Sequence, residues 1–153
     1  MKKLLYLFLA ISIISCGGDD DENSSTNFLS IYNGITWVEP GPFEGQYVRY
    51  WYNFSPNGFY EGEAYSADGE SLDCGTNYLA WGANNSGYSF EVIENSSEIL
   101  RLFFTETDGQ YNYEATITYT VSSDGNSLIE EYTDDEFGTS YSTYVRDSSF
   151  TCP

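Results

Sequence analysis

The chain has no histidine, its only lysines are Lys2 and Lys3, and three arginines complete its basic residues. Without histidine, and with lysine confined to the first three residues, catalytic triads, Schiff-base lysines and histidine-based metal sites are excluded. Nucleic acid is excluded as a partner, because Arg49, Arg101 and Arg146 are too few to form a basic patch.

Acidic residues dominate the charge. The chain has 24 of them and a net charge of −19. If the first fifteen residues are removed, three arginines face the same 24 acids and the charge becomes −21. This excess favours solubility, repels anionic surfaces and could attract divalent cations.

Residues 1–15 have the features of a secretory signal. Lys2 and Lys3 precede an apolar run, Leu4 to Ile14, that is far shorter than the roughly 20 residues needed to span a bilayer. The residues before Cys16 resemble the bacterial lipobox, which implies cleavage before Cys16 and lipidation of its side chain. An ordinary secretory signal followed by an incidental cysteine is the alternative.

Residues 16–27 are predicted to be an acidic, disordered tether, because Gly17 to Asn27 contains no aliphatic or aromatic residue. Its acidic start resembles the export signal of surface lipoproteins of the Bacteroidetes. A solvated spacer that stays off the anionic membrane surface is the alternative. We therefore expect a lipid-anchored outer-membrane protein and leave open which face of the membrane it occupies.

Residues 28–153 suit one domain of all-β class. Helix signals are missing, and short runs rich in Tyr, Phe, Val, Ile and Thr recur between Gly, Asn, Asp and Ser clusters. The clearest run, Tyr111 to Val121, alternates with period two, so one of its faces is predicted to be buried. The short connections favour an up-and-down antiparallel meander of eight or nine strands. We expect it to close into a barrel, with an open sheet or a sandwich as the alternative.

Cys74 and Cys152 remain once Cys16 is assigned to lipid. Outside the cytoplasm they can form one disulfide, although two buried thiols are the alternative. The bridge would close a loop of nearly eighty residues and stabilise the fold by roughly 4 kcal/mol.

The domain resembles the small lipocalin-like lipoproteins of Bacteroidetes. The similarity rests on the lipobox, an early Trp37, the hairpin Phe54 to Gly58, and the positions of Cys74 and Cys152. In lipocalins a tryptophan of the first strand packs on an arginine of the last strand, and Trp37 and Arg146 have these positions. The segment Gly34 to Trp37 is one residue longer than the lipocalin Gly-x-Trp signature. The resemblance implies a small barrel that binds an apolar or amphipathic molecule.

Carboxylates are the remaining catalytic chemistry. Glu61 and Glu63 share one strand face, roughly 7 Å apart, near the separation that inverting glycosidases use. In so acidic a chain we interpret this pair as part of a solvated face, and we predict that the protein is not an enzyme and has no catalytic residues.

Metal sites and cofactors are not predicted. Two loops offer oxygen ligands that suit calcium, but neither has the spacing of an EF-hand. Their acidic residues are Asp68, Glu70, Asp73, Asp134, Asp135 and Glu136.

Aromatic residues make up 18% of the chain. Most of them are predicted to form the core, and the many tyrosines favour an interior that is part polar and part apolar, as in a ligand cavity. The predicted ligand-binding residues are Tyr50, Tyr52, Phe90, Leu102, Tyr113 and Tyr119.

The opposite face of the Tyr50 strand carries Tyr47, Arg49, Trp51 and Asn53, a mixture that could stack on a sugar. We favour an ordinary outer face on which Trp51 covers a neighbouring strand. Arg49 and Arg101 interrupt apolar strands and are expected to point outward beside surface acids, because an unpaired buried guanidinium is costly.

Two functions follow as hypotheses. The first is a monomeric, membrane-tethered binding protein that holds a small hydrophobic or amphipathic ligand in a barrel. The second is a surface carbohydrate-binding or adhesion module that uses exposed aromatics such as Trp51 and Trp81.

Overall fold

The computed structural model describes residues 26–41, 48–65, 73–83, 87–109, 111–150 and 152. These residues form one sheet preceded by a single helical turn, α1 (Phe28–Ile31). The all-β prediction is therefore confirmed. The sequence showed no helix signal, and the turn α1 is the one helical segment of the described residues that it did not predict. The strands are β1 (Thr36–Val38), β2 (Val48–Ser55), β3 (Gly58–Tyr65), β4 (Asp73–Ala80), β5 (Tyr88–Asn95), β6 (Ile99–Asp108), β7 (Tyr111–Val121), β8 (Ser127–Asp134) and β9 (Gly138–Arg146).

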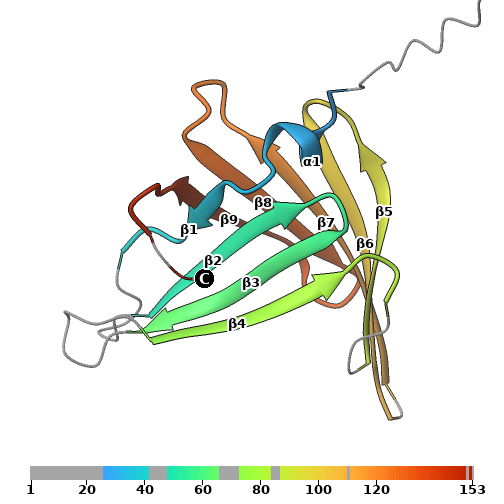
Figure 1. Ribbon diagram of the computed structural model, residues 1–153. Helices are drawn as coiled ribbons and strands as arrows, with labels where there is room; N and C mark the ends of the chain where they lie inside the picture. The colour runs from blue at the N-terminus through green and yellow to red at the C-terminus, as the bar shows by residue number, and fades with distance from the viewer. Residues whose placement is uncertain are drawn as a thin grey trace, which may run out of the picture.

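The sheet is an antiparallel meander of nine strands in the order β4-β3-β2-β1-β9-β8-β7-β6-β5. Each strand pairs with its neighbour in the chain except β4 and β5, and β1 also pairs with β9. Figure 1 shows β2, β3 and β4 as one wall and β5 to β8 as a second wall facing it. The meander is confirmed, including its number of strands.

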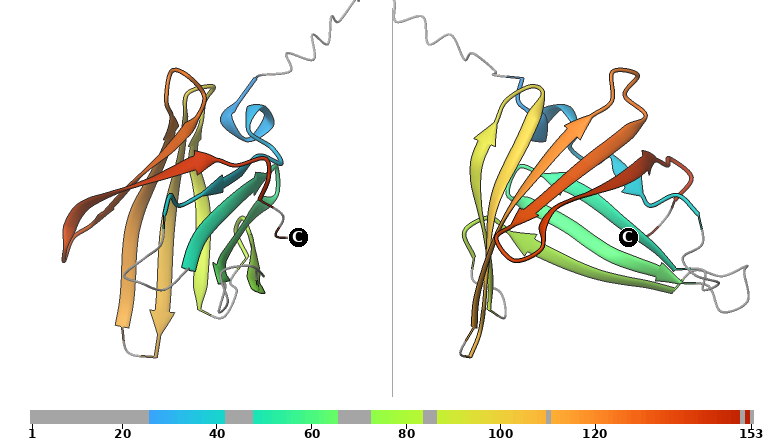
Figure 2. Two further views of the ribbon diagram at one scale, coloured as in Figure 1. Left: turned by 90° about the vertical axis from the view of Figure 1, so that its left-hand side faces the viewer. Right: turned by 180° about the vertical axis from the view of Figure 1, so that it is seen from behind.

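The predicted closure into a barrel is wrong, because β4 and β5 are the two edges of the sheet. They are joined near their connection, where the Gly82 amide donates to the Phe90 carbonyl at 2.7 Å. From there the two strands diverge, as the right-hand view in Figure 2 shows. We call the gap between these two edges the seam. The open sheet was the alternative to a barrel in the sequence analysis, and it is the arrangement observed.

Alternation along each strand sets the inner and outer faces, as β7 illustrates. Its buried residues Ala115, Ile117 and Tyr119 alternate with part-exposed threonines, and this confirms the period-two interpretation. The turn into β8 depends on Gly125, whose φ of +73° lies in the left-handed region that favours glycine. The Gly125 amide donates to the Ser122 carbonyl at 2.8 Å and closes this turn.

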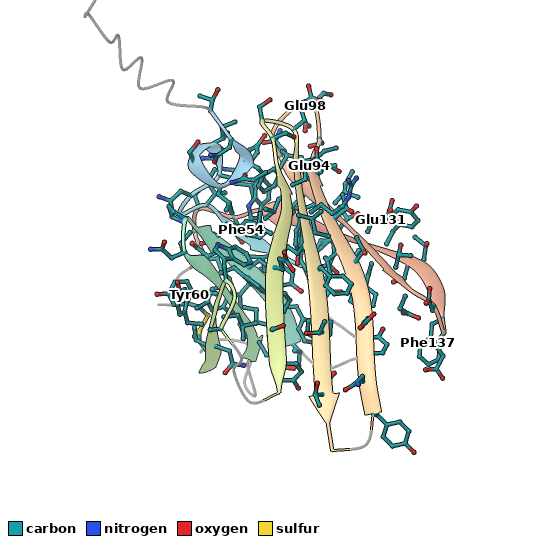
Figure 3. The ribbon with its side chains drawn as sticks, turned by 90° about the vertical axis from the view of Figure 1, so that its right-hand side faces the viewer. Phe54, Tyr60, Glu94, Glu98, Glu131 and Phe137 are labelled. Atoms are coloured by element: carbon teal, nitrogen blue, oxygen red, sulfur yellow. A yellow bond between two sulfur atoms is a disulfide. The ribbon has the colours of Figure 1, made fainter. Side chains whose placement is uncertain are left out.

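The turn α1 covers one end of the interior. Asn27 and Ser30 form a capping box, and the Leu29 amide donates to Asn95 Oδ1 at 3.2 Å. Phe28 is fully buried and packs edge-on against Phe54, with ring centroids 5.7 Å apart. Figure 3 shows Phe54 inside the sheet below α1. This end is filled by side chains, so the open part of the interior lies toward the seam.

The segment after β9 covers part of the outer face. Cys152 is bonded to Cys74 of β4, with Cα atoms 5.7 Å apart, so the predicted disulfide is confirmed. Phe150 lies against Trp51, and their ring centroids are 6.0 Å apart. Trp51 is only 2% exposed as a result and forms a small outer cluster with Val38 and Ala64.

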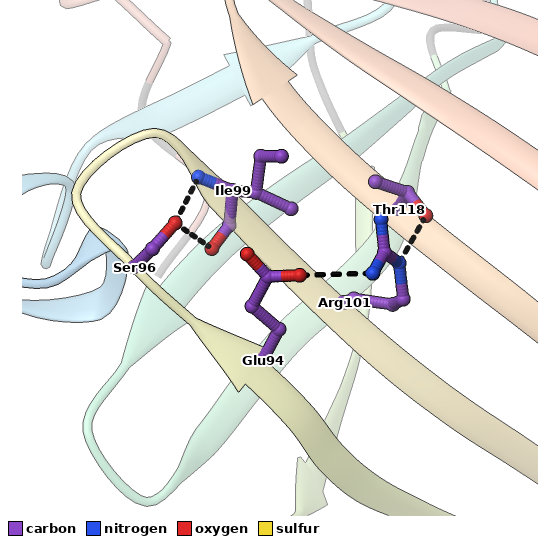
Figure 4. A network of polar contacts seen from close by, with 5 residues as sticks. All are labelled: Glu94, Ser96, Ile99, Arg101 and Thr118. Atoms are coloured by element: carbon purple, nitrogen blue, oxygen red, sulfur yellow. Dashed lines mark hydrogen bonds and ion pairs between the residues drawn. The ribbon is translucent and has the colours of Figure 1, made fainter.

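The arginines of two strands lie on the outer face, as predicted. In Figure 4, Arg101 Nη1 donates to Glu94 Oε2 at 2.8 Å, and Arg101 Nε donates to Thr118 Oγ1 at 3.4 Å. Arg49 forms a looser ion pair of 3.6 Å with Asp147. Both pairs are part-exposed, so each adds little to stability.

Candidate functional site: an acidic, aromatic cavity at the seam

A cavity of about 700 Å³ opens between the two walls of the sheet. Phe59, Phe90 and Phe104 form its apolar side, and the carboxylates of Glu61 and Glu130 lie on its polar side. Residues of both edge strands border it, which places its mouth at the seam. Its lining consists of Tyr52, Phe59, Glu61, Thr76, Asn77, Tyr78, Leu79, Tyr88, Phe90, Phe104, Ile117, Tyr119, Glu130 and Tyr132.

A second cavity of about 550 Å³ continues along β2, β3 and β4. It shares Tyr52, Glu61, Thr76 and Asn77 with the first, so the two form one trough with Glu61 between them. Tyr50 and Glu63 line only the second cavity. The negative charge of Glu63 raises the pKa of the Tyr50 hydroxyl, to which it is also hydrogen-bonded.

Glu130 of β8 is the more enclosed of the two acids that line the first cavity. Burial raises the pKa of its carboxyl, and hydrogen bonds from the hydroxyls of Tyr119 and Tyr52 lower it in part. The nearby charge of Glu61 raises it again. Tyr119 is itself 1% exposed, and burial raises its pKa well above the usual value, so it stays a neutral donor to Glu130.

Glu61 of β3 faces Glu130 across the cavity but has fewer hydrogen-bond partners than Glu130 has. Burial raises the pKa of its carboxyl. Within the described part of the chain it has neither a hydrogen-bond donor nor a cation as partner. The prediction that Glu61 and Glu63 form a solvated face is wrong for Glu61, which is half-buried in the first cavity, and holds for Glu63, which lines the second cavity but is exposed to solvent.

Among the described residues, no cationic side chain is paired with the cavity acids. Arg49 and Arg101 are occupied by Asp147 and Glu94 on the outer face. Arg146 is exposed at the end of β9, and the sequence offers no other basic residue after Lys3. The two carboxylates therefore face each other with no cation from the described chain between them, an expensive arrangement for a structural core.

Four of the six predicted ligand-binding residues line the two cavities. Tyr52, Phe90 and Tyr119 line the first cavity, and Tyr50 lines the second. Leu102 is fully buried in the core and belongs to neither lining.

Tyr113 belongs to a hydrogen-bonded chain at the β8–β9 hairpin. Its hydroxyl donates to Asp134 Oδ2 at 2.9 Å and accepts from the Tyr132 hydroxyl at 2.9 Å. Asp134 Oδ1 accepts from the amides of Glu136 and Phe137 at 2.8 and 2.5 Å. These bonds make Asp134 a turn-stabilising residue, in a loop that the sequence offered as a weak calcium candidate.

Several lining residues were missed from the sequence, above all Glu130. In the run Ser127 to Thr133 the adjacent pair Glu130 and Glu131 suggests a polar surface. Period two places Glu130 on the same face as the buried Leu128, and this signal could have found it. The sequence did not identify three other lining residues, because an inward-facing aromatic has the same period-two alternation whether it fills the core or lines a cavity. These residues are Phe59, Phe104 and Tyr132.

The exposed tryptophan platform is not present. Trp51 is buried beneath Phe150, and this supports the interpretation of Trp51 as a cover for neighbouring strands. Trp81 is half-buried and lies on Phe59, with ring centroids 5.4 Å apart and planes inclined by 31°. Both rings therefore serve packing.

Trp37 and Arg146 are backbone partners in the β1–β9 ladder, whereas the lipocalin resemblance implies that their side chains pack together. Trp37 is fully buried and lies edge-on to Tyr32, with ring centroids 6.0 Å apart, while Arg146 is exposed. The pairing is present, and Tyr32 is the ring that contacts Trp37.

Among the described residues, no group of three acidic or cysteine side chains is arranged to hold a metal ion. The loop with Asp68 and Glu70 lies outside the described residues, as does Cys16. The helical content of the described chain includes nothing long and apolar enough to cross a bilayer. Comparisons with protein-family models, curated proteins and solved structures find no match to this chain.

Proposed function

We propose that this chain is a lipid-anchored binding protein of the outer membrane that holds one small amphipathic molecule in the cavity at the seam. The observation that carries the proposal is a cavity of about 700 Å³ with phenylalanines on one side and two carboxylates and several tyrosines on the other. Ligand cavities have this composition, an apolar wall with a few convergent polar groups.

The described polar groups favour binding over catalysis. The tyrosines around Glu130 have raised pKa values, chiefly because they are buried, and act as neutral hydrogen-bond donors. Burial raises the pKa of Tyr144 to about 12. Such hydroxyls fix the position of a bound polar group without exchanging protons near neutral pH.

Native mass spectrometry of the full lipidated chain, purified from its own membranes, tests the proposal. We expect a mass above that of the acylated polypeptide which returns to the bare value after gentle activation. A bare mass under several growth conditions, together with no retention of any amphiphile added to the purified protein, would overturn it.

A second candidate function has one observation in its favour. Tyr60 and Tyr78 lie side by side on β3 and β4, with ring centroids 4.7 Å apart, and are 39% and 42% exposed. Paired exposed rings suit stacking on a sugar, so a carbohydrate-binding role would rest on this pair and not on Trp51. Loss of glycan retention in Tyr60→Ala and Tyr78→Ala, at unchanged melting temperature, would support it; equal retention would end it.

A further inference from the structure

The charge of the cavity identifies the chemistry of the molecule that fits it. Glu61 and Glu130 line the same space, and the charge of Glu61 acts on Glu130. The segments outside the described residues contain no histidine, and apart from Lys2 and Lys3 they contain no lysine or arginine. The domain therefore places two acids in a partly enclosed cavity and supplies no cation to pair with them.

Hydrogen bonds inside the protein satisfy only part of this site. Glu130 accepts from Tyr119 and Tyr52, but Glu61 has no donor within the described chain. A carboxylate has about four acceptor positions, so both acids keep acceptor positions directed at the cavity. A ligand with several N–H donors and a positive charge would fill them.

The aromatic walls favour the same class of ligand. Phe59 contacts Phe90 edge-on with ring centroids 5.1 Å apart, and Phe90 lies 5.0 Å from Phe104. These rings form an apolar surface for a hydrocarbon or a flat ring. The rings of Tyr52 and Tyr119 also lie near Glu130, to which their hydroxyls donate.

We propose that the ligand is an amphipathic amine, whose ammonium group lies between Glu61 and Glu130 and whose apolar body packs against Phe59, Phe90 and Phe104. This inference rests on the proposed function and names the chemical class of its ligand. The excess of acidic residues over the whole surface raises the local concentration of such cations and speeds their association.

Two matched trios of probes test the inference on the full folded chain by isothermal titration calorimetry. The alkyl trio is dodecylamine, dodecanol and dodecanoate, each below its critical micelle concentration. The indolyl trio is tryptamine, tryptophol and indole-3-acetate. Within each trio the apolar body stays similar and the charge of the polar end changes. We expect the amine of at least one trio to bind at least about tenfold more tightly than its alcohol, and the carboxylate to bind most weakly.

Three variants localise the effect. Glu61→Gln and Glu130→Gln each keep the shape of the side chain and remove its charge, so each is expected to weaken amine binding by about tenfold or more. Glu131→Gln is the matched control, since Glu131 follows Glu130 on β8 and lies on the outer side of the sheet (Figure 3). It should leave amine affinity within about twofold. If Glu130→Gln does not fold, as a melting curve would show, Glu61→Gln decides alone.

The outcomes separate the two proposals. Equal affinity for amine and alcohol, or tighter binding of the carboxylate, would overturn the amine inference and leave an amphiphile-binding cavity standing. Amine binding that survives Glu61→Gln unchanged in a folded protein would also overturn the inference. Failure of all six probes to bind would count against the cavity as a binding site and so against the proposed function itself.

Discussion

Trp51 lies over Gly62 on the outer face of the sheet, so close that a Cβ atom on Gly62 would come within 2.8 Å of Trp51 Nε1. The same atom would collide with the carbonyl oxygen of Gly75 on the neighbouring strand. Gly62→Ala is therefore expected to separate β3 from β4 locally and to lower the free energy of unfolding by about 1–3 kcal/mol. Urea denaturation followed by tyrosine and tryptophan fluorescence measures this loss.

Gly75→Ala is the control for this prediction. A Cβ atom there has only an ordinary contact of 3.8 Å, with the carbonyl oxygen of Glu63. The control should unfold within about 0.5 kcal/mol of the parent, as is usual for substitutions that touch no special feature. If both variants lost the same free energy of unfolding, the flexibility of glycine, and not the close packing of Gly62 beneath Trp51, would explain the loss.

The bond between Cys74 and Cys152 should be a major source of stability. It joins residues 78 positions apart and anchors the segment that covers Trp51. Replacing both cysteines by serine is expected to cost roughly 4 kcal/mol, because the open chain has more unfolded conformations. Thermal melting of the variant and of the reduced parent should agree, and an unchanged melting temperature in either would contradict the prediction.

Asp134 should make the stability depend on pH. The Phe137 amide and the Tyr113 hydroxyl, among other donors, hold the pKa of this carboxyl below its ordinary value of 3.8. The stabilisation is present above pH 3.8, where the unfolded state is ionised, and is lost as the pH falls through the lower folded-state pKa. We expect Asp134→Asn to melt below the parent at pH 7 and the difference to close as the pH falls below the folded-state pKa of Asp134. Asp135→Asn, at an exposed neighbour, is the control and should melt with the parent at pH 7.

Tyr119→Phe should shift the pH at which the proposed amine binding is lost. A proton competes with the ammonium for Glu130, so affinity falls as the pH drops through the pKa of that carboxyl. The Tyr119 hydrogen bond lowers this pKa, and its removal raises it. The midpoint of binding against pH should therefore move upward, with Glu61, Tyr52 and Tyr144 still facing Glu130. A midpoint that moves downward, or does not move, would show that Tyr119 does not act on Glu130.

The proposed lipid anchor makes a prediction of its own. Cells grown with labelled palmitate should label the parent chain and not Cys16→Ser, and the variant should leave the membrane fraction. Ser15→Ala serves as a control that keeps the cysteine. Labelling of Cys16→Ser at the level of the parent would rule out lipidation at this residue.

The strands were predictable because their signal is local. In the run Tyr111 to Val121, residues that become buried alternate with residues that stay exposed, so the sequence indicates the sheet face of each side chain. The hairpin turns are also short and rich in glycine. Barrel closure has no such signal, since it depends on whether two distant edges, β4 and β5, come into register. The covering of Trp51 by Phe150 is equally non-local, because the two residues are nearly a hundred positions apart.

The candidate site was predictable in part for the same reason. Tyr52, Phe90 and Tyr119 were identified because they lie on inner faces, which period two reveals. Glu61 and Glu130 were not interpreted as cavity residues, because in an acidic chain a glutamate is usually solvated. Their role depends on a juxtaposition of β3 with β8, which are far apart in both the chain and the sheet order.

The seam gives the cavity a slot for an entrance in place of a circular mouth. In a closed barrel, the loops around the mouth admit a molecule end-on and limit its length. Here the two diverging strand edges limit its thickness instead. A long-tailed amphiphile could enter broadside, bury its head group and leave its tail protruding between the edges. Coupled to a tether at the membrane surface, such a slot would suit a protein that exchanges its cargo directly with a lipid layer.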